Sequence, residues 1–154
     1  MNNVLRNSSL DIFFSKIRSE NKKIVFTNGC FDIIHPGHIH VLSQAKLLGH
    51  ILVVGLNSDK SVKKLKGKER PLVNESDRAK ILLSIKYVDY VTIFDESTPK
   101  DIIEKIKPDT LVKGGDYILD DIVGSKFVID SGGRVEIVKF LDGYSSSNYI
   151  DNLN

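Results

Sequence analysis

The segment His35-Pro36-Gly37-His38 brings together residue types that can act on a phosphate group. A short apolar run at 24–26 precedes it and an amphipathic run follows it, so we expect it at the start of a helix. Helix N-terminal amides and imidazole donors can stabilise charge that develops on a phosphate, and Gly37 lets the backbone approach such a ligand. Zinc is a competing interpretation, but a convincing third ligand is lacking. Two ordinary loop histidines are the structural alternative.

A lysine-rich segment follows a second apolar run at 51–56. Only Asp59 and Glu69 oppose its cations, which are Lys60, Lys63, Lys64, Lys66, Lys68 and Arg70. This local positive charge attracts phosphate or another anion, and flexible lysines can hold a triphosphate or a leaving pyrophosphate. We expect a loop kept mobile by Gly67, with a merely solvated loop as the alternative. Arg78, in the next helix, would by itself form a surface ion pair.

Two later segments also carry ligand-binding residue types. In the segment 113–117, Asp116 and Tyr117 suit hydrogen bonding and stacking with a base or ribose, while a tight turn with a buried tyrosine is the alternative. In the segment 143–147, serine hydroxyls at a helix start suit a phosphate, or they simply cap the helix.

Asp32 and Cys30 lie close to the histidine pair. Asp32 precedes His35 by three residues, and we expect it to orient a histidine or to stabilise the turn. Cys30 is the only thiol. It is expected as a small buried residue and not as a nucleophile, because no leaving-group chemistry here requires a thiol.

The composition indicates a cytoplasmic globular domain. The chain has 154 residues, the size of one domain, and no apolar run approaches the roughly 20 residues of a membrane span. The first residues lack the apolar stretch of a signal peptide, and one cysteine excludes an internal disulfide. A net charge of +2, from 22 Lys and Arg against 20 Asp and Glu, is weaker than the bias of a typical nucleic-acid-binding domain.

Apolar runs alternate with helical patterns along the chain. Strands are expected at 24–26, 51–56, 88–94, 110–112 and 134–140, and helices at 10–17, 38–48, 74–86, 98–107, 125–130 and 146–153. This order predicts an α/β fold, namely a Rossmann-like, doubly wound, mostly parallel five-stranded sheet with helices on both faces. We expect a single domain over 1–154, with residues 1–22 as an N-terminal helical extension. Ligands bind at the carboxyl ends of such strands, so the segments described above should meet in one crevice.

The segment from Gly29 to His38 resembles the G-x-F-D-x-x-H-x-G-H signature of the cytidylyltransferase-like nucleotidyltransferase family. Residues 145–147 resemble its second, serine-rich signature, although the arginine that often follows is replaced by residues 148–150, Asn-Tyr-Ile. From about Lys23 onward, the chain also resembles the heptose 1-phosphate adenylyltransferase domain of ADP-heptose synthesis. The segments that carry this likeness are 27–32, 57–59, 65–67, 70–71, 111–117, 124–126 and 142–143.

The resemblance implies transfer of AMP from ATP to a heptose 1-phosphate, giving ADP-heptose and pyrophosphate. It implies catalytic roles for His35, His38, Lys66 and Arg78. It also implies nucleotide contacts from Thr27, Asn28, Gly29, Phe31, Asp32, Gly37, Asn57, Lys68, Lys113, Gly115, Asp116, Tyr117, Ser145 and Ser146. Mg²⁺ is expected to bind mainly through nucleotide phosphates and not in a protein metal site. A separate sugar kinase is expected upstream in the pathway.

Other functions compete with this interpretation. The same chemistry with CTP and glycerol 3-phosphate, or a similar polyol phosphate, differs only in a few pocket contacts. A non-catalytic nucleotide sensor would not need both His35 and His38. We expect neither a nucleic-acid nor a membrane partner. A homodimer stays open, because Phe13 and Phe14 suit a dimer contact as well as the core.

Overall fold

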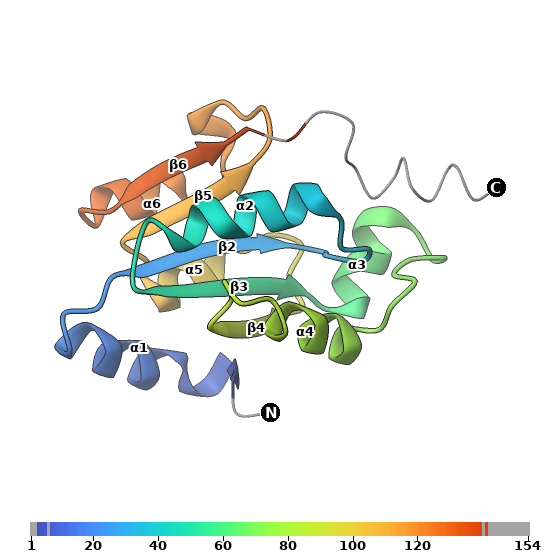
Figure 1. Ribbon diagram of the computed structural model, residues 1–154, viewed down its shortest axis with the longest axis horizontal. Coiled ribbons are helices and arrows are strands. Elements are labelled where there is room, and N and C mark those ends of the chain that lie inside the picture. Colours follow the sequence, from blue (N-terminus) through green and yellow to red (C-terminus); the bar gives the residue numbers. More distant parts are fainter. Residues whose placement is uncertain (1–2, 6, 140, 142–154) are drawn as a thin grey trace.

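A single parallel sheet with the strand order β1-β4-β3-β2-β5-β6 forms the centre of the protein (Figure 1). The computed structural model describes residues 3–5, 7–139 and 141. The strands are β1 (Val4–Leu5), β2 (Ile24–Gly29), β3 (Ile51–Asn57), β4 (Tyr90–Phe94), β5 (Thr110–Gly114) and β6 (Arg134–Val138). The helices are α1 (Leu10–Ser19), α2 (Pro36–Lys46), α3 (Asp59–Lys66), α4 (Glu75–Leu83), α5 (Lys100–Ile106) and α6 (Ser125–Asp130), with 3₁₀ turns η1 (Asn7–Ser9) and η2 (Leu119–Asp121).

The strand order confirms the predicted doubly wound α/β fold. From β2 the chain adds β3 and then β4 on one side, and it later adds β5 and β6 on the other. The order therefore reverses between β2 and β5, which is the point where such folds bind ligands.

The described part of the sheet has six strands, one more than the five predicted. The additional strand, β1, pairs with β4 at the edge, with Val4 opposite Val91 and Leu5 opposite Thr92. The N-terminal residues therefore supply a strand as well as the expected helix. A strand of two residues is too short to show the alternation by which strands are predicted.

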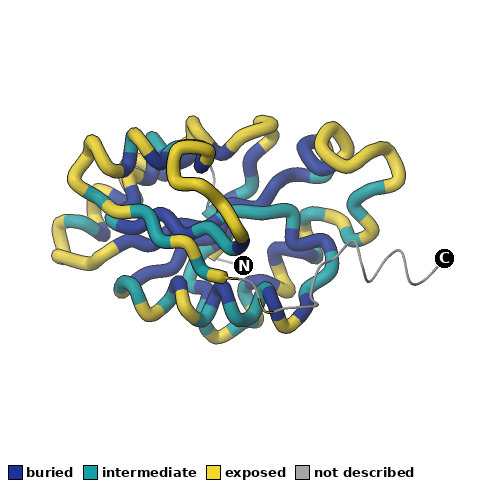
Figure 2. The backbone as a smooth tube through the Cα atoms, turned by 90° about the horizontal axis from the view of Figure 1, so that it is seen from above, coloured by how far each residue is buried: buried dark blue, intermediate teal, exposed yellow. Residues whose placement is uncertain are grey.

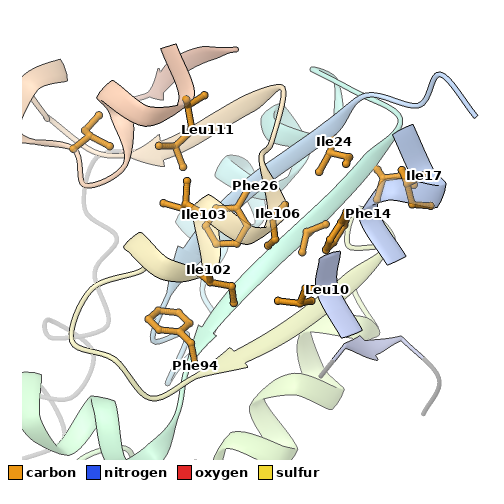
Figure 3. Close-up of a cluster of buried hydrophobic side chains, with 14 residues drawn as sticks. Leu10, Phe14, Ile17, Ile24, Phe26, Phe94, Ile102, Ile103, Ile106 and Leu111 are labelled. Carbon is orange, nitrogen blue, oxygen red and sulfur yellow. The ribbon is translucent and has the colours of Figure 1, made fainter. Parts of the chain in front are cut away.

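Different helices cover the two faces of the sheet, because successive strand side chains point to opposite faces. On one face, α1, α5 and α6 pack against a cluster that includes Phe14, Phe26 and Leu111 (Figure 3). On the other face, α2 and α4 pack against a cluster that includes Val25 and Leu52. Buried residues follow the central strands and exposed residues gather in the outer loops (Figure 2). In the described ranges, no helix combines the length and apolar character needed to cross a membrane.

The lysine-rich segment forms a helix, α3, as far as Lys66, where the sequence predicted a flexible loop, and Lys68 and Arg70 follow the end of this helix. Ser58 caps it by accepting a hydrogen bond from the backbone N–H of Ser61 at 3.1 Å. Ser61 and Val62 are the buried residues of this helix, which ends at Gly67, whose φ of 97° favours glycine. With so few apolar residues in the segment, its helical periodicity was hard to detect. By contrast, the predicted cap of α4 is confirmed, since the side chain of Asn74 accepts from the backbone N–H of Asp77.

The first prediction concerns α1. Phe14 is fully buried against the sheet, and the half-buried ring of Phe13 lies 4.9 Å from the ring of Tyr90. The substitution Phe14→Ala should therefore lower the free energy of unfolding by about 3–5 kcal/mol, measured by urea denaturation. Ile12→Ala in the same helix, where the side chain is 79% exposed, is the control and should change it by about 0.5 kcal/mol or less. Equal effects of the two substitutions would show that α1 is not part of the core.

Candidate active site

A cavity of about 280 Å³ opens where β2 and β5 end, beside the start of α2 and the end of α3. Eight residues that the sequence singled out for catalysis or nucleotide contact line it: Thr27, Asn28, Gly29, Phe31, His38, Lys66, Lys113 and Tyr117. Cys30, Val41 and Gly114 also line it. Three of the four segments that were expected to meet at the strand ends therefore contribute to one crevice, and the fourth, 143–147, lies outside the described residues. Gly114 belongs to the segment 113–117 that the sequence singled out, whereas Val41 was missed because an apolar helix residue gives no signal of its own in sequence.

The two histidines lie against each other at the start of α2. His35 is the residue before the helix and Pro36 is its first residue, as the sequence indicated. The rings of His35 and His38 are stacked, with their centroids 3.8 Å apart. The Nδ1 atom of His38 accepts a hydrogen bond from the backbone N–H of His35 at 3.4 Å, so a neutral His38 ring carries its proton on Nε2. His38 lines the cavity, whereas His35 is buried next to it and does not.

Burial keeps both rings neutral at pH 7. Burial, together with the nearby His35 and Lys66, lowers the pKa of His38 to about 4, and burial is the largest of these causes. Burial also lowers the pKa of His35 below its ordinary value. His38 therefore offers a neutral N–H donor to an anion in the cavity, and the two stacked rings do not form a pair of imidazolium ions.

Asp32 positions a neighbouring loop and is not part of the cavity lining. Its buried carboxylate accepts a hydrogen bond from Arg70 Nε at 2.6 Å and others from the backbone N–H groups of Leu72 and Val73, at 2.8 and 3.0 Å. Burial opposes ionisation, but the hydrogen bonds from Val73, Leu72 and Arg70 outweigh it and hold the pKa of Asp32 below its ordinary value. The hydrogen bonds of Asp32 thus direct its carboxylate at this loop, in agreement with the expected structural role, while the nucleotide contact that the resemblance implied stays a prediction.

Arg78 is buried, in contrast to the surface ion pair expected from its sequence position. Its guanidinium donates to the carbonyl oxygens of Val73, Cys30 and Asn57 at 2.8, 2.6 and 2.8 Å, and to Asp59 Oδ1 at 2.7 Å. All these hydrogen bonds go to groups of the protein, and Arg78 does not line the cavity. Arg78 therefore joins the loops around the site, and this geometry does not supply the phosphate contact that was expected of it.

Several other expected contacts also lie away from the cavity. Asn57 is buried and donates to Ser61 Oγ at 2.9 Å, so it holds the start of α3. Lys68 is exposed beyond the end of α3 and does not line the cavity, although Lys66 does. Gly37 is buried in the first turn of α2 and is also absent from the lining.

The segment at the end of β5, residues 113–117, also contains both residues that line the cavity and residues that do not. Gly115 has a φ of 128° and donates its backbone N–H to the carbonyl of Val138 at 2.9 Å, which turns the chain at the strand end. Asp116 is exposed and does not line the cavity, while Tyr117 lines it with a ring that is 47% exposed. Tyr117 is therefore not the buried tyrosine of the structural alternative. Ser145 and Ser146, the expected phosphate contacts near the C-terminus, lie outside the described residues.

Cys30 is part of the cavity wall and is not fully buried, which differs from the expected core position. Burial raises the pKa of its thiol, so the thiol is protonated at pH 7 and is a poor nucleophile. Within the ranges that the structure describes, no group of three or more His, Cys, Asp or Glu side chains is arranged to hold a metal ion.

Comparison with known proteins gives relatives that match most of the chain. It is 54% identical over 136 residues to bifunctional protein HldE of Geobacter metallireducens, and 51% identical over 148 residues to that of Citrifermentans bemidjiense. These matches cover 88% and 94% of this chain but only 28% and 30% of the relatives. The chain therefore spans less than a third of the length of these curated relatives.

A solved structure shares the fold. The lipopolysaccharide core biosynthesis protein from Thermoplasma volcanium superposes with a TM-score of 0.64 at 31% identity, covering 80% of this chain and 99% of that one. The cytidylyltransferase-like family model matches residues 26–151, which include the histidine pair and every residue that lines the cavity. The chain therefore belongs to the cytidylyltransferase-like family and is a nucleotidyltransferase.

Proposed function

We propose that the protein transfers AMP from ATP to a heptose 1-phosphate, giving ADP-heptose and pyrophosphate. The observation that carries the proposal is the cavity at the start of α2, where His38 and Lys66 face the same space and no carboxylate among the described residues lines it. Such a lining suits a phosphate-rich substrate, because every charged side chain in it is cationic. The likeness to the adenylyltransferase domain of ADP-heptose synthesis supports ATP and a heptose phosphate as the substrates.

The geometry supports direct transfer. An oxygen of the acceptor phosphate attacks the α-phosphorus of ATP, the bond from that phosphorus to the bridging oxygen breaks, and pyrophosphate leaves with the electron pair. The described lining holds no nucleophile paired with a base, and its one thiol is protonated at pH 7. The chain would accelerate this step by positioning the substrates and stabilising charge.

The side chains divide these tasks. The Nε2–H of His38 and the amides at the start of α2 would donate to the α-phosphoryl oxygens, while His35 holds the ring of His38 by stacking. Lys66 would neutralise the leaving pyrophosphate. Mg²⁺, when bound, supplies further positive charge, and a cavity whose described lining holds no carboxylate fits an ion that is held by phosphate oxygens.

The proposed function is tested by pyrophosphate release in the presence of Mg²⁺, over the four nucleoside triphosphates and a set of phosphorylated acceptors. We expect release with ATP and a heptose 1-phosphate. Release with CTP and glycerol 3-phosphate would keep the mechanism but replace the substrates. No release with any pair would contradict the proposed function and favour a nucleotide sensor.

The substitution His38→Ala should lower kcat by about 10²–10³, because one preorganised donor to the transition state is lost. The affinity for ATP, measured by calorimetry, should fall much less. His40→Ala is the matched control, since His40 lies in the same helix and does not line the cavity. Turnover of the His38→Ala variant near the wild-type rate would refute the role of His38.

The protonation of His38 gives a pH-dependent prediction. In the ligand-free protein, its imidazole NMR signal should titrate with a midpoint near 4, because burial lowers its pKa. Since the unfolded value is about 6.5, the ring stabilises the fold at neutral pH, and this contribution is lost as the pH falls from about 6.5 toward the folded value. Bound ATP should raise the midpoint through its negative charge. A midpoint near the unfolded value without ligand would show that the ring is solvated.

A further inference from the structure

Lys113 is a half-buried cation without a carboxylate partner in the described part of the chain. Its Nζ donates to the side-chain amide oxygen of Asn28 at 3.1 Å and lies 5.8 Å from the centre of the Tyr117 ring. Both partners are neutral. Burial lowers the pKa of the Lys113 ammonium, because leaving water disfavours its charged form. The cavity wall thus contains a positive charge that the described protein groups do not neutralise.

Such a charge indicates an anionic ligand. Removing an ammonium group from water costs free energy unless an anion compensates its charge. At Lys46 the protein itself supplies the compensating charge, because the ammonium of Lys46 pairs with the carboxylate of Asp89 at 2.5 Å. Around Lys113, by contrast, no Asp or Glu of the described residues lines the cavity. The counter-charge for Lys113 is therefore expected from the substrate.

The topology places this cation opposite Lys66. Strand β2 lies between β3 and β5 in the sheet (Figure 1), and the histidine pair follows β2. Lys66 is at the end of α3, which follows β3, whereas Lys113 belongs to β5. The two lysines therefore approach the cavity from opposite sides of the strand that leads to the histidines.

In-line phosphoryl transfer needs this kind of arrangement, because the attacking and leaving oxygens must lie on opposite sides of the phosphorus. If the α-phosphate of ATP lies at the start of α2, a leaving pyrophosphate held by Lys66 occupies the β3 side. The attacking phosphate then arrives from the β5 side, where Lys113 is the cation that lines the described cavity.

We propose that Lys113 binds the phosphate group of the acceptor and thereby selects phosphate monoesters over uncharged acceptors. This inference rests on the proposed function. It assigns Lys113 to the acceptor, whereas the resemblance implied that Lys113 contacts the nucleotide. Asn28 orients the ammonium through its amide oxygen and is a positioning residue. Tyr117 limits the site on its exposed side and offers a ring face to the carbon skeleton of the acceptor.

Steady-state kinetics with each substrate varied in turn tests the inference. Lys113→Met should raise the KM for heptose 1-phosphate by about tenfold to a hundredfold, the range for loss of a charged hydrogen bond, and leave the KM for ATP nearly unchanged. Lys66→Ala should give the reverse pattern. Lys113→Arg keeps the cation and should recover part of the loss. Lys16→Met, an exposed lysine of α1, is the control and should change neither constant.

Two results would overturn the inference. One is a rise in the KM for ATP alone in Lys113→Met, and the other is an equal rise for both substrates. If the wild-type protein shows no turnover with any pair, the proposed function fails, and calorimetric titration with heptose 1-phosphate still decides on Lys113. Binding that is lost in Lys113→Met supports the inference. Equal titrations of the two proteins, including no binding by either, contradict it. Lys113→Gln replaces Lys113→Met if circular dichroism shows that the methionine variant is unfolded.

Discussion

One buried guanidinium, that of Arg78, holds together the loops on which the candidate site depends. It bonds the carbonyls of Cys30, Asn57 and Val73, which lie after β2, at the end of β3 and before α4, and it pairs with Asp59 at the start of α3. A charge buried this deeply is tolerated only because all these partners are in place, so the loops are fixed relative to one another. The cavity takes its shape from this constraint.

The chemistry that we propose uses only groups that these fixed loops and the neighbouring elements can hold in place. The catalytic parts are neutral imidazoles, helix amides and two lysines, none of which needs to form a bond to the substrate. His38 is kept neutral by burial, Lys66 reaches the cavity from a helix that Ser58 and Asn57 anchor, and Lys113 reaches it from the neighbouring strand. Preorganised donors and charges of this kind act on the charge that develops in the transition state.

Sequence patterns predicted the structural features that depend on residues close to one another in the chain. The alternation of strands and helices gave the doubly wound fold, and the cap at Asn74 is confirmed. The two-residue strand β1 carries no periodicity, and the charged sequence of α3 resembles a loop. The burial of Arg78 and the pairing of Asp32 with Arg70 depend on contacts between residues far apart in the chain, which local patterns do not record. Sequence reasoning therefore identified most of the cavity lining, whereas the family resemblance assigned Arg78 and Asp32 to ligand binding and did not indicate their structural contacts.

The central claim is that AMP passes directly from ATP to the acceptor without a covalent enzyme intermediate. The most direct test is the stereochemical course at the α-phosphorus, followed by ³¹P NMR with the Sp isomer of ATPαS as the substrate. A single in-line displacement inverts the configuration at phosphorus, and inversion is the result we predict. Retention would require two successive displacements, and so an enzyme nucleophile, which would contradict the account.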